Sequence, residues 1–206
     1  MKTTLQRKPL MPAEAEWGEM LPEGWGPVSA EEFESWGDDE DNPKELIGGW
    51  VLPMAPINAD SGRSTYRISM ALHSIISANR WDILPDSRHR LPAPTHTVVY
   101  PDIAIHAVEH ADYLPGTETV GRVPELVIEI LAKRTWRRDV GPNGVKFLAY
   151  QRSGVKEYYY TWPDGEDASG FALKKGVFSP IRKDADGFFK SPLLGCSLRL
   201  VQAATR

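Results

Sequence analysis

The segment Glu125–Leu131 constrains the fold more than any other part of the chain. It reads Glu-Leu-Val-Ile-Glu-Ile-Leu, so that Glu129 interrupts an otherwise apolar run. Short apolar runs of this kind favour a central β-strand that is covered on both faces. A carboxylate inside such a strand is costly unless it is paired or binds a cation. We therefore expect Glu129 to have a cationic partner in the interior of an α/β protein.

A second strand-like segment also carries an acid. Residues 97–107 are β-branched and apolar, and they are interrupted at Pro101, which Asp102 follows. Two strands that each present one acid can bring both carboxylates to a single metal ion, and hard oxygen ligands suit Mg²⁺ or Mn²⁺. Such an ion can polarise a phosphodiester and generate hydroxide from bound water. Each acid also has a structural interpretation, since Asp102 could cap a turn and Glu129 could pair with an arginine.

Positive charge follows Glu129 directly along the chain. The cations of this stretch are Lys133, Arg134, Arg137 and Arg138. Beside a metal site they would attract the polyanionic backbone of a nucleic acid. The alternative is an ordinary solvated loop.

A predicted helix over residues 145–152 carries the remaining candidate. Lys146 and Tyr150 stand one helical turn apart and share a face. Lys146 could orient the attacking water or stabilise the charge of the transition state. Gly154 stands where a helix C-terminus favours glycine.

Other local patterns predict an α/β sandwich on a mixed sheet. Ser29 and Glu32 form a capping box that begins a helix through Trp36. Gly48-Gly49 predicts the turn of a hairpin over residues 45–52. Further expected elements are a helix over 63–79, one strand within 80–96, a strand over 155–162, and a closing meander at 171–173, 177–181 and 188–189 with a turn at 186–187.

Composition sets outer limits on the class of protein. The chain has 206 residues, which fits an N-terminal extension over residues 1–27 and a single domain over residues 28–206. It contains no apolar run long enough to span a membrane and no signal-like N-terminus, so we expect a cytoplasmic protein without a membrane partner. The lone Cys196 excludes an internal disulfide. The net charge of −4 argues against a surface that is basic throughout.

An ordered set of motifs resembles the Uma2 (DUF820) family of the PD-(D/E)XK nuclease superfamily over residues 45–200. The similar segments are Glu45-Leu-Ile-x-Gly49, Pro101-Asp102, the strand with central Glu129, Arg137-Arg-Asp139, Lys146-x3-Tyr150-x3-Gly154-Val-x-Glu-Tyr158, and Asp186 to Gly195. The resemblance implies a restriction-endonuclease-like fold, in which helices flank a mixed central sheet with extra hairpins. It implies Asp102 and Glu129 as metal ligands and Lys146 as the third catalytic residue, with Glu45 and Asp139 as possible supporting residues.

The implied activity is that of an endonuclease that uses Mg²⁺ or Mn²⁺ to hydrolyse phosphodiester bonds, with DNA as the expected substrate. The superfamily signature has its lysine two residues after the glutamate, where this chain has Leu131, and the family lysine corresponds to Lys146. The six residues between Asp139 and Lys146 exceed the spacing expected for the family, and this difference could displace Lys146. The alternative is therefore a catalytically inactive nuclease-fold module that binds nucleic acid or a protein partner. A homodimer paired through a sheet edge is a third hypothesis.

Two further patterns compete with the nuclease interpretation. His106-Ala-Val-Glu-His110 matches the H-x-x-E-H string of zinc peptidases. In a strand, however, residues four apart are separated by about 13 Å, which is too far for one zinc ion, so we expect surface histidines. The aromatic run of Tyr158, Tyr159, Tyr160 and Trp162 is expected to pack the sheet rather than stack on bases.

Overall fold

The computed structural model describes residues 28–37, 42–56, 59–92, 96–110, 113–114, 117–165 and 167–200. Its helices are α1 (Ala30–Ser35), α2 (Ala59–Ile75), η2 (Val108–His110), α3 (Trp136–Asp139) and α4 (Val145–Ser153). Its strands are β1 (Lys44–Ile47), β2 (Trp50–Pro53), β3 (Trp81–Pro85), β4 (His89–Leu91), β5 (Thr97–Val99), β6 (Ile103–Ala107), β7 (Leu126–Ile130), β8 (Glu157–Thr161), β9 (Ser169–Lys174), β10 (Val177–Ile181), β11 (Phe189–Lys190) and β12 (Ser197–Leu198). The N-terminal extension predicted over residues 1–27 lies outside these described ranges.

The strands form a larger mixed sheet and a smaller antiparallel one. The larger sheet has the order β10-β9-β8-β7-β6-β3, and within it only the β7–β8 pair is parallel. The smaller sheet has the order β2-β1-β5-β4, while β11 and β12 pair separately. All five residues of β7 are buried. The predicted central strand and the mixed α/β class are thus confirmed.

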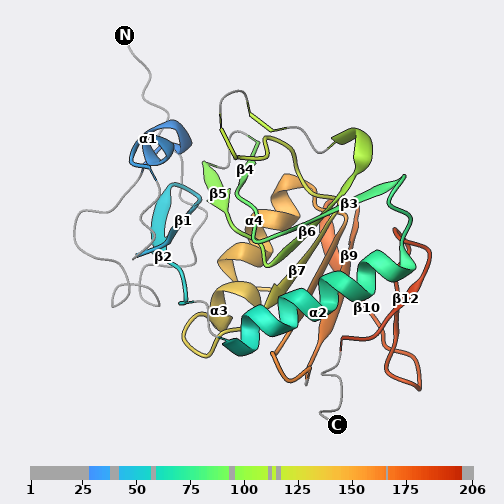
Figure 1. Cartoon of the computed structure of the whole chain (residues 1–206). Helices are drawn as coiled ribbons and strands as arrows, with labels where there is room; N and C mark the ends of the chain where they lie inside the picture. The colour runs from blue at the N-terminus through green and yellow to red at the C-terminus, as the bar shows by residue number, and fades with distance from the viewer. Residues whose placement is uncertain are drawn as a thin grey trace.

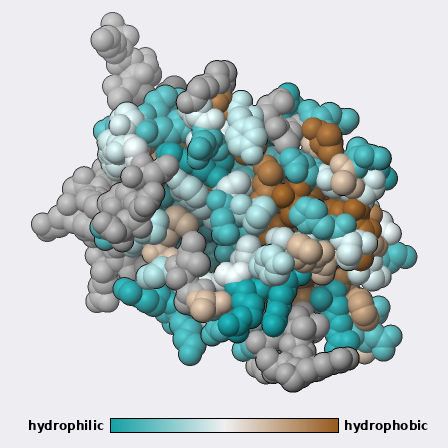
Figure 2. Space-filling view, viewed as in Figure 1, coloured by the Kyte–Doolittle hydropathy of each residue, from teal (hydrophilic) through white to brown (hydrophobic). Residues whose placement is uncertain are grey.

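Helices cover the larger sheet on both faces (Figure 1). Leu72 of α2 packs in one apolar cluster with Ile128 of β7, and Phe147 of α4 packs in another with Val127. Neighbouring residues of a strand point to opposite faces, so α2 and α4 contact opposite faces of β7. On the side viewed in Figure 2, hydrophobic residues gather around the C-terminal half of α2 and the adjoining β3.

The interruption at Pro101 separates two sheets. β5 ends at Val99 and pairs with β1 and β4 in the smaller sheet. β6 begins at Ile103 and pairs with β3 and β7 in the larger sheet. Because proline has no N–H to continue a ladder, the chain leaves one sheet here and enters the other. Asp102 consequently lies at the junction of the two sheets.

The smaller sheet is held together by features that the sequence predicts. The turn between β1 and β2 has positive φ at Gly48 (62°) and Gly49 (88°), as a two-residue hairpin turn requires. Val98 of β5 pairs with Leu46 of β1. The predicted hairpin is confirmed, and it carries Glu45 into the interior.

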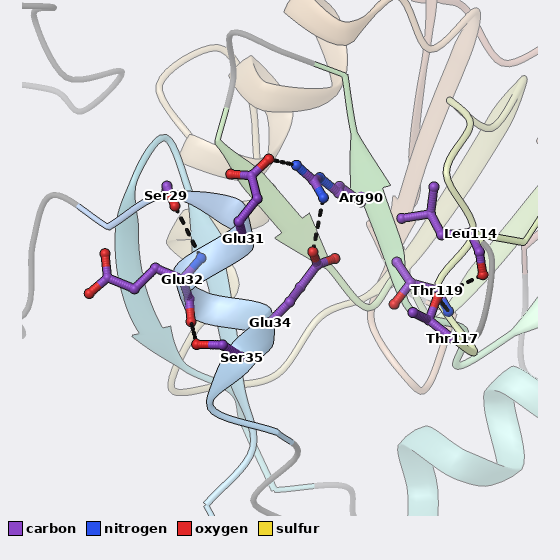
Figure 3. Close-up of polar contacts among 9 residues, drawn as sticks. All are labelled: Ser29, Glu31, Glu32, Glu34, Ser35, Arg90, Leu114, Thr117 and Thr119. Atoms are coloured by element: carbon purple, nitrogen blue, oxygen red, sulfur yellow. Dashed lines mark hydrogen bonds and ion pairs between the residues drawn. The ribbon is translucent and has the colours of Figure 1, made fainter.

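Helix α1 packs on this sheet through polar contacts (Figure 3). The Ser29 hydroxyl accepts a hydrogen bond from the Glu32 amide at 3.0 Å, which confirms the Ser29 half of the predicted capping box. Arg90 of β4 pairs with Glu34 at 3.0 Å and also with Glu31. The first helix is thereby fixed to the sheet that borders Asp102.

Several sequence predictions need correction. Residues 80–96 contain two strands, β3 and β4, because Asp86 adopts a left-handed turn (φ 47°) between them. Helix α2 begins at Ala59 and ends at Ile75, and the short α3 lies within the stretch expected to be a loop. The closing strands do not form one meander, since β11 pairs with β12 outside the larger sheet.

The expectation of surface histidines is wrong for His106. Its side chain is fully buried, and its Nε2 lies 2.9 Å from Nε2 of the equally buried His89. His106 belongs to β6, an interior strand of the larger sheet, and β4 of the smaller sheet covers it. The aromatic prediction is confirmed at Tyr158 and Tyr159, which are buried in the sheet packing. Within the described ranges, no helix is long and apolar enough to cross a membrane.

Candidate active site

The two candidate metal ligands, Asp102 and Glu129, lie side by side on neighbouring strands. Ile103 of β6 pairs with Ile128 of β7, so the positions of Asp102 and Glu129 face each other across the same antiparallel pair. Residues at opposed positions point to the same face of a sheet. Asp102 Oδ2 also accepts a hydrogen bond of 2.7 Å from the Ile130 amide, which fixes its carboxylate at the end of β7.

Helix α4 supplies the cationic partner that the sequence predicts for Glu129. Lys146 Nζ lies 2.8 Å from Glu129 Oε1, and the Tyr150 hydroxyl donates to that same oxygen at 2.7 Å. The spacing of four residues puts both side chains on the helix face that packs against β7. Lys146 is buried, unlike most helix lysines.

Glu45 reaches the site from the smaller sheet. Its Oε1 lies 3.0 Å from Lys146 Nζ and accepts a hydrogen bond of 3.0 Å from the Tyr100 amide. Asp139, at the end of α3, is also buried, and its backbone oxygen accepts from the Tyr158 hydroxyl at 2.8 Å. The structure therefore brings both residues predicted to support the site close to Lys146.

The acids of the site are held in an environment that opposes their ionisation. Burial raises the pKa of Asp102 well above its usual value, and the neighbouring charge of Glu129 raises it further. Burial likewise raises the pKa values of Glu129 and Asp139. Burial alone would lower the pKa of Lys146, but Glu129, Glu45 and Asp139 together raise it well above the usual range. The ammonium is thus charged, while the carboxylates gain from any further cation.

These side chains line a cavity of about 80 Å³. Its charged lining consists of Glu45, Asp86, Asp102, Glu129, Arg138, Asp139 and Lys146. No local sequence pattern selects Asp86, whose pKa is raised by burial. Its amide donates to the Asp102 carbonyl at 3.2 Å, so the turn after β3 brings it to the site. Asp86 can be identified as a residue of the site only from the pairing of β3 with β6 in the folded protein.

The basic stretch divides between the surface and the interior. Lys133, Arg134 and Arg137 are exposed, but Arg138 is only 3% exposed and donates to the Pro53 carbonyl. Three of the four cations predicted to contact a nucleic acid therefore lie at the surface, while Arg138 lies in the cavity wall. Arg138 is drawn inward because Glu45 and Asp139 lie near its guanidinium.

Comparisons with known proteins assign the chain to a family. The family model described as "Putative restriction endonuclease", Uma2, matches residues 30–199. The chain belongs to the Uma2 family. A crystal structure from Anabaena variabilis, described as a "putative nuclease belonging to DUF820", has a TM-score of 0.66 and 14% sequence identity to this chain. The match covers 84% of this chain and 96% of that one, and it supports the shared fold. A comparison with curated proteins found no match.

The longer spacing before the Uma2 lysine does not displace it. The additional residues form a compact turn, in which a Cβ on Gly144 would lie 2.4 Å from the Val140 carbonyl oxygen. A Cβ on Gly141 would similarly lie 2.4 Å from the Phe147 ring. Lys146 stays beside Glu129 because two glycines let the turn before α4 pack closely.

The donor set fits a hydrated divalent cation better than an all-protein metal cage. Within the residues that the structure describes, no three His, Cys, Asp or Glu side chains are arranged to enclose a metal ion. Mg²⁺ typically binds through one or two carboxylates and keeps several waters. Asp102 and Glu129 supply two such groups, and a bound cation would favour their ionised forms, which burial disfavours.

Proposed function

We propose that this Uma2 protein is a divalent-metal-dependent nuclease that hydrolyses phosphodiester bonds, with DNA as the expected substrate. One observation carries the proposal: two carboxylates on adjacent strands share a cavity with a buried lysine that contacts one of them. Family membership agrees with this activity. A purely structural ion pair would need no second buried acid beside it.

Asp102 and Glu129 are the residues that would hold Mg²⁺ or Mn²⁺. When bound, such an ion polarises the phosphodiester and lowers the pKa of its bound water, which supplies the nucleophile near neutral pH. The amide of Ile130 holds the Asp102 carboxylate against β7, the strand that carries Glu129. This preorganisation reduces the entropy lost when the site engages a phosphate.

Lys146 would act on the substrate as a fixed positive charge. Three carboxylates keep its ammonium protonated. With two of its three N–H donors on Glu45 and Glu129, the third can orient a water or stabilise the negative charge that develops on the phosphate oxygens. Glu45 and Tyr150 serve as positioning residues, since Glu45 holds the ammonium and Tyr150 holds the Glu129 oxygen that it contacts.

The exposed cations Lys133, Arg134 and Arg137 would bind the nucleic-acid backbone beside the cavity. Backbone contacts of this kind position a substrate without reading its sequence. They also make binding weaken as salt concentration rises.

One observation favours a second candidate, a nuclease-fold module that binds nucleic acid or a protein partner without catalysis. Lys146 and Tyr150 both contact the same Glu129 oxygen, so the ammonium itself compensates much of the buried negative charge. Such a module would bind nucleic acid equally well with and without metal.

Cleavage assays separate the two candidates. The full chain would be incubated with supercoiled DNA, single-stranded DNA and RNA in Mg²⁺, in Mn²⁺ or in EDTA. The nuclease proposal predicts cleavage of at least one substrate in metal and none in EDTA. Binding without cleavage in every condition would support the inactive module, and cleavage that persists in EDTA would contradict metal dependence.

A further inference from the structure

A second, larger cavity adjoins the carboxylate site. Its volume is about 570 Å³, and residues between Lys133 and Gly144 line it. Thr135 and Arg138 line both this cavity and the one that contains the carboxylates. A chain-like substrate whose phosphate lies at the carboxylates could therefore extend its next unit into the larger cavity.

The size and lining of this cavity suit a small, negatively charged ligand with an aromatic part. Cavities that hold small ligands measure roughly 300–1,000 Å³. The residues that give this one its chemistry are Lys133, Arg134, Trp136, Arg137, Arg138 and Asn143. Cationic groups can bind a phosphate, an aromatic ring can contact a base, and an amide can form hydrogen bonds with either.

Trp136 is the distinctive member of this set. Its ring is half-buried, and the Arg137 guanidinium carbon lies 5.1 Å from its centroid. The Trp162 ring lies near it, with the two centroids 6.4 Å apart and tilted by 50°. Tryptophan that lines a basic cavity offers a flat surface on which any of the bases can stack.

We propose that this cavity binds one unpaired nucleotide beside the scissile phosphate, so that the substrate is single-stranded or locally unpaired. The location beside a scissile phosphate rests on the proposed nuclease function, whereas the binding itself does not. Within a duplex both faces of a base are covered by its neighbours. A base must therefore leave the stack, or start unpaired, before it can contact Trp136.

Binding measured without metal tests the proposal independently of cleavage. Fluorescence anisotropy in EDTA would compare an end-labelled single-stranded oligonucleotide with its blunt duplex of equal length. We expect the single strand to bind more tightly by about tenfold, and Trp136→Leu to remove about tenfold of its affinity while leaving duplex binding unchanged. Trp136→Phe should retain most of the single-strand affinity, because it keeps an aromatic face.

A second arginine–tryptophan pair, outside the cavity, provides a control for the charge of Arg137. Arg80 lies over the ring of Trp81 at 5.8 Å, as Arg137 does over Trp136, but it does not line the cavity. Arg137→Gln should weaken single-strand binding and reduce its salt dependence, whereas Arg80→Gln should do neither. Deoxy and ribo oligonucleotides of one sequence would show whether the nucleotide is DNA or RNA, and selective binding of either would support the proposal.

Two results would overturn the proposed nucleotide site. One is equal affinity of the wild-type protein for single strand and duplex. The other is unchanged single-strand affinity in a folded Trp136→Leu variant, which would leave only phosphate binding by surface cations. If the binding pattern holds but no cleavage occurs in metal, the proposed nuclease function fails while the nucleotide site stands.

Discussion

Lys146 Nζ lies 2.8 Å from Glu129 Oε1, in a site where both side chains are buried. The pair links the helix on one face of the larger sheet to the strand at its centre. The same ammonium contacts Glu45, which arrives from the smaller sheet. One positive charge thus compensates acids from two sheets, and its removal should affect stability as well as chemistry.

Lys146→Met should destabilise the metal-free protein by about 3–5 kcal/mol, because it leaves buried carboxylates without their partner. Mn²⁺ should restore more stability to this variant than it adds to the wild type, since a cation at the site replaces the lost charge. Urea unfolding with and without Mn²⁺ measures both effects. Lys156→Met is the matched control, because Lys156 is 57% exposed and lies 3.7 Å from Glu125. Equal losses in the two variants would contradict the role given to Lys146.

Without metal, the stability advantage of the Asp102→Asn variant over the wild type should grow as pH rises. The pKa of Asp102 is raised in the folded protein by burial and by Glu129. The folded state therefore binds a proton more tightly than the unfolded chain does, and ionisation of Asp102 costs stability as pH rises from about 4 through the raised pKa. Asparagine removes that cost and keeps an oxygen for the Ile130 amide. A stability difference that stays constant with pH would contradict this account.

The His89–His106 pair should make the wild type sensitive to acid. Burial, together with the nearby His106 and against the effect of the Ser87 carbonyl, lowers the pKa of His89 to about 4. In the unfolded chain His89 takes up a proton near pH 6.5, whereas in the folded protein it does so only near pH 4. The stability that the folded protein gains from the neutral histidine is therefore fully present above pH 6.5 and is lost as pH falls towards 4.

The loss should amount to about 3 kcal/mol, measured as the difference between wild type and a His89→Leu/His106→Leu double variant in urea unfolding at pH 7 and pH 4. The difference isolates the histidines from the carboxylates that also titrate in this range. If both proteins lose the same stability, the pair does not respond to acid.

Gly144→Ala should lower cleavage without removing any catalytic group. A Cβ there would lie 2.4 Å from the Val140 carbonyl oxygen and 2.6 Å from that of Arg138. Backbone must shift, and α4 with Lys146 would move with it; misplacement by about 1 Å can cost a hundredfold in rate. Arg152→Ala changes an exposed residue of the same helix, which lines neither cavity, and should leave the rate unchanged. Similar rates for all three proteins would show that the compact turn is not required.

Local patterns predicted the centre of the fold and much of the candidate site. The apolar run around Glu129, the glycines of the β1–β2 turn and the helical spacing of Lys146 and Tyr150 each depend on neighbours within a few residues. A buried acid in a strand requires compensation, so a cationic partner could be expected, although α4 as its source came from family resemblance rather than spacing.

Contacts made across the fold could not be predicted in the same way. Asp86 joins the site because β3 pairs with β6, and His106 is buried because β4 of another sheet covers it. Arg138 differs from its neighbour Arg137 because the short helix α3 turns one side chain inward and the other outward. None of these relationships has a signature within a short window of sequence.

The most direct test of the central claim compares the wild type with Glu129→Gln in a cleavage assay with Mn²⁺. Glutamine keeps the size of the side chain but removes the charge that would hold the metal. Metal-dependent catalysis at this site predicts cleavage by the wild type and a rate at least about a hundredfold lower for the folded variant. Equal cleavage rates for the two proteins would contradict the assignment of this site as the active centre.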